Sequence, residues 1–266
     1  APSGKNLGYF LGGKYLYEKE FCLSNYNDDS QVILVCEGIY QEATISINRQ
    51  TIHHNLYGYN EIILDITDFV SFDKENKISI IADNSKQPNS RWYSGSGVIR
   101  PINLFILPKE RIEFESLKVT TINYKEGKIR VEATLSINGK AKIEIFDAKN
   151  NLVVEKIMEG KEINQFLYIP NVKLWNHDHP YLYKAKISFK NDSQEINFGV
   201  RQIELTNDMG LLINGEKTIL YGACIHHVLG NFAAEANYFV EKRAMLKLKE
   251  IGFNAIRSAH NPCSRS

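Results

Sequence analysis

TILYGACIHH at residues 218–227 and FNAIRSAHNP at residues 253–262 share one pattern, a short apolar run that ends in polar side chains. These runs predict strands over 218–223 and 253–259. Between them Val240, Ala244, Leu248 and Ile251 recur at helical spacing, and Gly252 is expected to end the helix. Strand, helix and strand form one βαβ unit, and α/β folds place active sites at the carboxyl ends of such strands.

Two motifs of this region, GACIHHVLG at 222–230 and LKEIGFNAIRSAHNP at 248–262, carry a family resemblance. Three further stretches agree with it: NSRWYSGSGVIRP at 89–101, KLWNHDHPYLY at 173–183 and FGVRQIEL at 198–205. Together they resemble glycoside hydrolase family 2, the family of β-galactosidases, β-glucuronidases and β-mannosidases. The stretches follow one another in the family's order, so the resemblance covers nearly the whole chain and implies that residues 205–266 begin a (β/α)8 catalytic barrel.

Residues 1–108 predict an all-β domain. Val32, Leu34 and Cys36 alternate onto one face, and further short strands are separated by turn residues. Many short strands favour a sandwich or jelly roll. The resemblance implies the family's sugar-binding jelly-roll domain, and Pro108 marks its expected end.

Residues 109–204 predict a second β-domain. The residues from Ile129 to Ile137 alternate strictly, and Asn138-Gly139 predicts a hairpin turn after them. A second alternation runs from Tyr181 to Phe189. About seven strands in under a hundred residues fit an immunoglobulin-like β-sandwich. The expected fold is therefore mainly β, with two sandwiches followed by the first βαβ unit of a TIM barrel.

Composition excludes several classes of protein. The net charge of +1 gives no electrostatic reason to expect nucleic acid or an anionic membrane as a partner. No apolar run approaches the roughly 20 residues of a membrane span, and no signal peptide is recognisable. Four cysteines without a CxxC pair favour reduced thiols in a cytoplasmic protein; a secreted or periplasmic protein whose signal peptide has been removed is the alternative.

No cofactor or metal ion is expected. The pairs His53–His54 and His177–His179 lack the further ligands of a zinc site. SGSGVIR lacks the third glycine and the helix of a dinucleotide-binding loop.

Glycoside hydrolysis with retention needs two carboxylates about 5–5.5 Å apart. The barrel segment contains four glutamates in polar turns or beside the helix, where solvated surface carboxylates are expected: Glu216, Glu235, Glu241 and Glu250. The resemblance implies that both catalytic glutamates lie beyond Ser266, so no catalytic residue is expected in this chain.

His226, Arg257 and His260 are the first set of candidate substrate-binding residues, because each sits towards the C-terminal end of a predicted strand, where side chains can converge on one ligand. The resemblance implies that the two histidines hydrogen-bond sugar hydroxyls and that Arg257 positions the nucleophile. A structural hydrogen-bond network is the alternative for all three, and His227 is a weaker candidate.

Asn89, Arg91 and Trp92 form the second set, in a loop that the resemblance places beside the sugar. For Trp92, packing at a domain interface is the alternative. Arg100 is expected to form a structural ion pair, and Asn261-Pro262 is expected to shape the loop after the second strand.

The resemblance implies a retaining β-glycosidase of carbohydrate catabolism that acts on terminal non-reducing β-linked sugars, with β-galactosides preferred. Its partner is a β-linked glycoside or oligosaccharide, and self-association into a homo-oligomer is compatible with it. The alternatives are a non-catalytic carbohydrate-binding or scaffold protein, and a β-glucuronidase or β-mannosidase of the same family. The βαβ unit is also expected to leave Val240, Leu248 and Ile251 exposed.

Overall fold

The structure is a computed structural model that describes residues 12–23, 26, 29–86, 95–226 and 234–265. The contacts divide the chain into two compact units. Unit 1 comprises residues 1–107 and 221–266, and unit 2 comprises residues 108–220. The sequence predicts domain boundaries after residues 108 and 204. The first division between the units falls one residue earlier, after residue 107. Residues 205–220, which the sequence assigns to the third domain, group with unit 2. The functional assignment of each domain stays a prediction.

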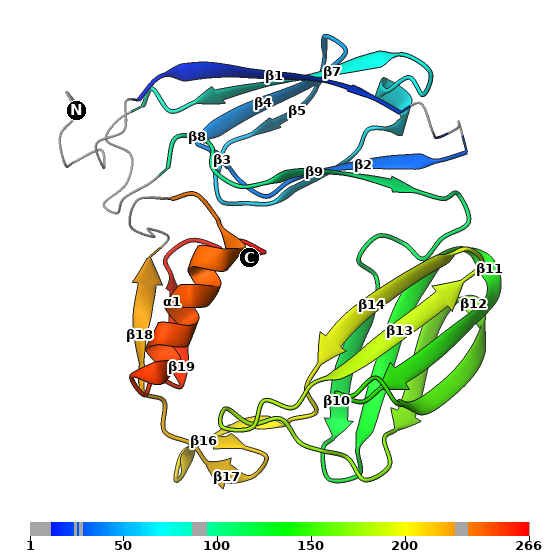
Figure 1. The fold of residues 1–266 in the computed structure, drawn as a ribbon, viewed down its shortest axis with the longest axis vertical. Helices are drawn as coiled ribbons and strands as arrows, with labels where there is room; N and C mark the ends of the chain where they lie inside the picture. Colours follow the sequence, from blue (N-terminus) through cyan, green and yellow to red (C-terminus); the bar gives the residue numbers. More distant parts are fainter. Residues whose placement is uncertain (1–11, 24–25, 27–28, 87–94, 227–233, 266) are drawn as a thin grey trace. The chain divides into compact units, whose positions relative to one another are not determined.

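Unit 1 contains a sandwich of two antiparallel sheets (Figure 1). One sheet has the order β1 (Lys14–Cys22), β7 (Glu75–Asp83), β4 (Glu42–Ile47), β5 (Gln50–Asn55). The other has the order β6 (Ile62–Asp65), β2 (Gln31–Cys36), β9 (Ile102–Leu107), and a 3-10 turn, η2 (Thr67–Phe69), follows β6. Val32, Ile45 and Ile80 lie in one buried cluster to which both sheets contribute. The alternation seen in the sequence therefore faces a shared core, and the expected β-sandwich is confirmed.

Two short strands, β3 (Ile39–Tyr40) and β8 (Gly97–Val98), pair beside this sandwich. Both precede Arg100, and Tyr40 of β3 lies in a small hydrophobic cluster with Tyr59 and Ile99. This corner of the sandwich is where unit 1 contacts its own C-terminal segment, as described below.

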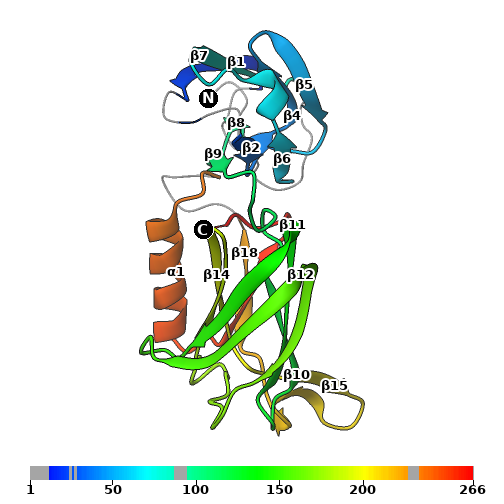
Figure 2. The ribbon, with the colours of Figure 1, turned by 90° about the vertical axis from the view of Figure 1, so that its right-hand side faces the viewer.

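Unit 2 is a second sandwich in which two long strands belong to both layers (Figures 1 and 2). Its strands are β10 (Lys118–Asn123), β11 (Lys128–Phe146), β12 (Leu152–Tyr168), β13 (Tyr183–Phe189) and β14 (Asp192–Phe198). The first half of β11 pairs with β10 and the end of β12; its second half pairs with the start of β12 and with β13. Because β11 and β12 each contribute one segment to each layer, the five strands give the seven strand segments that the sequence predicts. A small sheet of β15 (Ile203–Thr206), β16 (Gly210–Ile213) and β17 (Glu216–Lys217) follows.

The prediction of a hairpin turn at Asn138-Gly139 is wrong, because β11 continues through both residues. Neither residue has the positive φ that an Asn-Gly hairpin turn requires. A Cβ at Gly139 would lie 2.7 Å from Cε2 of Phe189, so the glycine lets the strand pass this ring where it crosses between the layers. The Asn-Gly pair therefore marks a bend in one strand.

The predicted βαβ unit is present in unit 1. It consists of β18 (Gly222–His226), α1 (Tyr238–Glu250) and β19 (Ala255–Ala259), and the two strands pair in parallel. Asn237 caps the helix by accepting from the amides of Phe239 and Val240. Gly252, with φ +95°, ends it as expected. The first strand begins at Gly222 and not at Thr218.

The exposure of the apolar side chains in this unit agrees in part with the prediction. Ile251 is 72% exposed, as expected, and Phe239 and Leu246 are also exposed, whereas Val240 and Leu248 are half-buried. Assignment of the unit to a (β/α)8 barrel stays a proposal. No helix among the described residues is long and apolar enough to cross a membrane.

Candidate functional site

The structure brings His226 and His260 together. His226 is the last residue of β18 and is level with Ala259, the last residue of β19, in the parallel register. His260 follows directly, and its ring centroid lies 5.2 Å from that of His226, with the ring planes at 62°. Parallel strands end at the same edge of a sheet, which is why two histidines 34 positions apart meet there.

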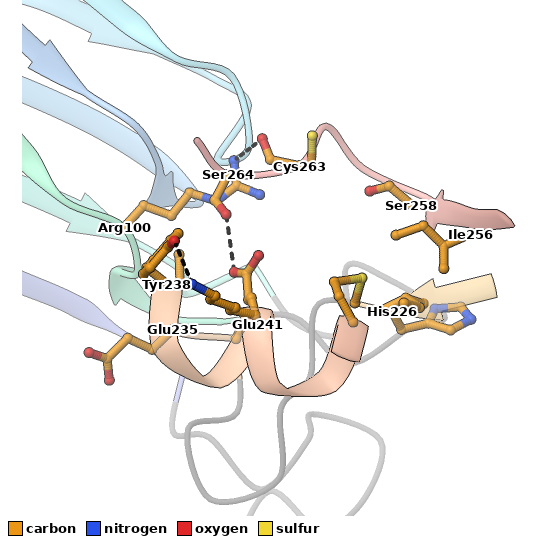
Figure 3. A pocket seen from close by; sticks show the side chains of 14 residues that line it. Arg100, His226, Glu235, Tyr238, Glu241, Ile256, Ser258, Cys263 and Ser264 are labelled. Atoms are coloured by element: carbon orange, nitrogen blue, oxygen red, sulfur yellow. Dashed lines mark hydrogen bonds between the residues drawn. The ribbon is translucent and has the colours of Figure 1, made fainter. Parts of the chain in front are cut away.

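Arg257 lies on β19 opposite Cys224 of β18. Its Nη1 donates to Sγ of Cys224 at 3.5 Å. Its neighbours Ile256 and Ser258 line a cavity between the strands and α1, which is described below (Figure 3). Successive residues of a strand point to opposite faces, so Arg257 points to the face of the strand pair away from α1. That face is the one a sheet closing into a barrel would enclose, with α1 on the outside.

A cavity of about 530 Å³ lies between α1 and the two strands (Figure 3). His226, Ile225 and Ile256 line it from the strands, and Met245 lines it from the helix. It is bordered by a hydrogen bond from Oγ of Ser264 to Oε1 of Glu241, 3.1 Å long. The helix therefore lies over the strand pair without filling the space between them.

Three of the four glutamates of this region lie on or beside the helix, as the sequence suggested, whereas Glu216 lies in a short strand and not in a turn. Glu241 is on α1 and accepts from Ser264, and Glu250 forms an ion pair with Lys247 at 2.6 Å. Glu235 is exposed ahead of the helix, and Glu216 is exposed in β17. None of the four is placed at the carboxyl end of β18 or β19, where a catalytic carboxylate is expected.

The segment after β19 is held to the sandwich of unit 1 by side chains that the sequence did not single out for this role. Oη of Tyr57 donates to Oδ1 of Asn261 at 2.6 Å. The guanidinium of Arg265 forms a paired contact with the carboxylate of Glu61, with Nη2 donating to Oε2 at 2.8 Å. Asn261 thus does take part in shaping this loop, through a contact that reaches across 204 positions of sequence.

Arg100 makes the most buried of these contacts. Arg100 is 5% exposed, and its guanidinium donates to the carbonyl oxygens of Pro262 at 2.6 Å and Cys263 at 3.3 Å. It also donates to the carbonyl oxygens of Glu37 and Tyr59, each at 3.3 Å, and its Cζ lies 5.3 Å from the Tyr59 ring centroid. Burial lowers the pKa of Arg100 from its ordinary value. Among the described residues its partners are main-chain carbonyls and an aromatic ring, and not the carboxylate of the ion pair that the sequence led us to expect.

The second set of candidates, Asn89, Arg91 and Trp92, lies outside the described residues, as does His227. Their roles stay predictions. Of the remaining histidines, His54 shares a hydrogen bond of 3.1 Å with Thr44, and Nε2 of His177 lies 3.4 Å from Oδ2 of Asp178. Within the part of the chain that the structure describes, no three His, Cys, Asp or Glu side chains gather as metal ligands would.

Comparison with known proteins gives consistent results for the whole chain. Residues 111–201 match the family model for glycosyl hydrolases family 2. The chain is 30% identical to the β-galactosidase BoGH2A of Bacteroides ovatus, over 98% of this chain and 33% of that protein. It is 27% identical to a β-glucuronidase of Bacteroides fragilis, over 92% of this chain and 40% of that protein. The chain thus spans between a third and two fifths of the length of these relatives.

Solved structures show the same relationship. A glycosyl hydrolase family 2 member from Bacteroides cellulosilyticus matches 97% of this chain and 38% of its own, with a TM-score of 0.88 and 31% identity. A β-glycosidase from Bacteroides vulgatus matches 99% of this chain and 36% of its own, with a TM-score of 0.86 and 25% identity. The family model, the relatives and the folds agree with the motifs, and the chain belongs to glycosyl hydrolase family 2.

Proposed function

We propose that the whole protein is a retaining β-glycosidase that removes terminal non-reducing sugars from β-linked glycosides, and that its preferred substrates are β-galactosides. The observation that carries this proposal is the pair of histidine rings, 5.2 Å apart, at the carboxyl ends of two parallel strands in a family 2 chain. That edge is where barrel enzymes assemble their active sites.

The chemistry of these side chains suits a sugar. Each sugar hydroxyl both donates and accepts hydrogen bonds, and a neutral imidazole offers one donor and one acceptor nitrogen. Two such rings, 5.2 Å apart, can therefore bind adjacent hydroxyl groups of one pyranose ring. The alternative role, a purely structural pair, predicts that changing either histidine alters stability without altering affinity for a sugar.

Arg257 has a different role in the proposal. It lies on the face of the strand pair that a closed barrel would enclose, next to Cys224. A guanidinium there can donate two parallel hydrogen bonds to a carboxylate and hold it ionised and oriented for attack on the sugar. We assign it to positioning the nucleophile of the double-displacement reaction.

Both carboxylates of that reaction are proposed to come from a part of the protein outside this chain. Double displacement needs a nucleophile and an acid/base about 5–5.5 Å apart. The glutamates of α1 and its neighbourhood lie on the helix side and not at the strand ends, and the matched relatives are far longer than this chain. This chain alone is therefore expected to be inactive.

A second substrate class has support from the comparisons. Three relatives at 27–28% identity are named as β-glucuronidase or putative β-glucuronidase. A glucuronide differs from a galactoside by carrying a carboxylate and by the configuration at C4. The substrate assay must therefore include both sugars.

The test is the hydrolysis of p-nitrophenyl β-galactoside, β-glucuronide and β-mannoside by the full-length protein and by this chain. We expect turnover of the galactoside by the full-length protein only. Full-length His260→Ala, with its stability measured in parallel, should lose activity while remaining folded. Preference for the glucuronide would correct the proposed sugar specificity. Absence of turnover with all three glycosides would favour a carbohydrate-binding or scaffold role. Turnover by this chain alone would show that the catalytic carboxylates lie within it and have been assigned wrongly.

A further inference from the structure

We infer that Arg100 is a positioning residue for the sugar subsite, because it clamps the segment after β19 to the sandwich and so fixes His260 opposite His226. This inference rests on the proposed function. It assigns to the sandwich a direct part in shaping the site, through a buried side chain that does not touch the sugar.

The guanidinium of Arg100 contacts four carbonyl oxygens, which belong to two separate parts of unit 1. Two acceptors, the carbonyls of Glu37 and Tyr59, belong to the sandwich. The other two, the carbonyls of Pro262 and Cys263, follow His260 by two and three positions. One guanidinium therefore connects the sandwich with the chain immediately after the strand end.

The connection that Arg100 makes is stiff. A buried guanidinium must have its donors satisfied, because an unpaired charged group away from water is costly. Arg100 is 5% exposed and follows the strand β8, so its guanidinium is held largely away from solvent at that corner. The planar fork also fixes the directions of its donors, which an ammonium group on a flexible stem does not do.

The clamped segment follows His260 directly in the sequence. His260 extends beyond the last residue paired in the register of β18 and β19, so strand pairing alone does not fix it. Its position is set from the preceding strand on one side and from the held residues 261–263 on the other. Tyr57, which donates to Asn261, is a second tether on the same short segment. Misplacement of a binding group by about 1 Å can cost about a hundredfold in rate.

The clamp itself can be tested on this chain by hydrogen exchange, without any activity. In Arg100→Lys, amides of the segment 259–263 should exchange at least about tenfold faster, while β2 and β9 keep their protection. Arg111→Lys is the matched control, since Arg111 also has a largely buried side chain and donates to a main-chain carbonyl, that of Lys109, but lies in unit 2. Unchanged exchange at 259–263 would overturn the clamp.

The consequence for the site is tested in the full-length protein by kinetics below the melting temperature of every variant. Arg100→Lys should lower kcat/KM for the glycoside by about tenfold to a hundredfold, chiefly through KM, since hydroxyl contacts are made in ground and transition states alike. Tyr57→Phe should have a smaller effect, and the double variant should lose less than the product of the two single effects, because both tethers hold one segment.

Each outcome has a distinct meaning. Non-additive losses for Arg100 and Tyr57, together with additive effects for Arg111 and Tyr57, support the positioning role. Faster exchange at 259–263 with unchanged KM and kcat would overturn it while leaving the proposed function intact. A wild-type protein inactive on all three glycosides would refute the proposed function and with it the role in a sugar subsite, and the exchange experiment would still decide whether the clamp exists.

Discussion

The core of unit 2 gives a quantitative prediction at Ile143. This side chain is fully buried on β11, with Lys156 of β12 and Ile187 of β13 as its neighbours in the register. Replacement by alanine removes three carbon groups, and at about 0.8 kcal/mol each the transfer term is about 2.4 kcal/mol. The cavity left behind adds to it, so we expect the free energy of unfolding to fall by about 3–4 kcal/mol.

Ile137→Ala is the matched control. Ile137 lies on the same strand but is 41% exposed. Its truncation should change the free energy of unfolding by no more than about 0.5 kcal/mol, as is usual for surface positions. The pair therefore differs in burial and not in residue type or strand.

Urea unfolding followed by tryptophan fluorescence measures both variants. The chain has two tryptophans, and a Trp92→Phe background leaves Trp175 as a reporter within unit 2. With a slope of about 2 kcal/mol per molar urea, Ile143→Ala should lower the midpoint by about 1.5–2 M. Equal midpoints for the two variants would refute the reasoning, because they would show that burial at Ile143 contributes nothing to the stability of unit 2.

Three further predictions concern single groups. Burial raises the pKa of Tyr59 from 10.0 to about 12. The neutral Tyr59 side chain therefore contributes its full stability below pH 10, and this contribution is lost as the pH rises towards 12. Tyr59→Phe should flatten that part of a curve of unfolding free energy against pH. Burial also raises the pKa of Cys36 to about 12, and a thiol reagent should label three cysteines in the native chain and all four in denaturant. Gly127→Ala should cost about 1–3 kcal/mol, measured by thermal unfolding, because Gly127 has φ +65° and its Cβ would lie 2.5 Å from the carbonyl oxygen of Ile169.

The parts of the molecule that local patterns specify could be predicted from the sequence. The helix of the βαβ unit and its end at Gly252 follow from spacing and from the conformational freedom of glycine. The proximity of His226 and His260 follows from strand order alone, because parallel strands end at one edge.

The rest depends on tertiary context. Asn138-Gly139 carries a strong local turn signal, but the continuous strand β11 and the ring of Phe189 override it. The contacts of Tyr57 and Arg100 with the segment after β19 join residues 162 to 204 positions apart, and no periodicity in the sequence records such pairs. Arg100 could be recognised as structural, whereas its acceptors could not be named, since carbonyl groups occur at every residue.

The division of the chain also bears on the order in which the protein can assemble during synthesis. Unit 1 is discontinuous, since residues 108–220 are made between its two parts. The carbonyl of Pro262 that Arg100 binds is 162 positions downstream, and at about 5–20 residues per second the ribosome needs about 8–32 s to reach it. During that interval the carbonyl oxygens of Pro262 and Cys263 are not yet available to Arg100, while unit 2 has its complete sequence available first. Residues 221–266 thus join a unit whose first strands leave the ribosome before residues 108–220 are made.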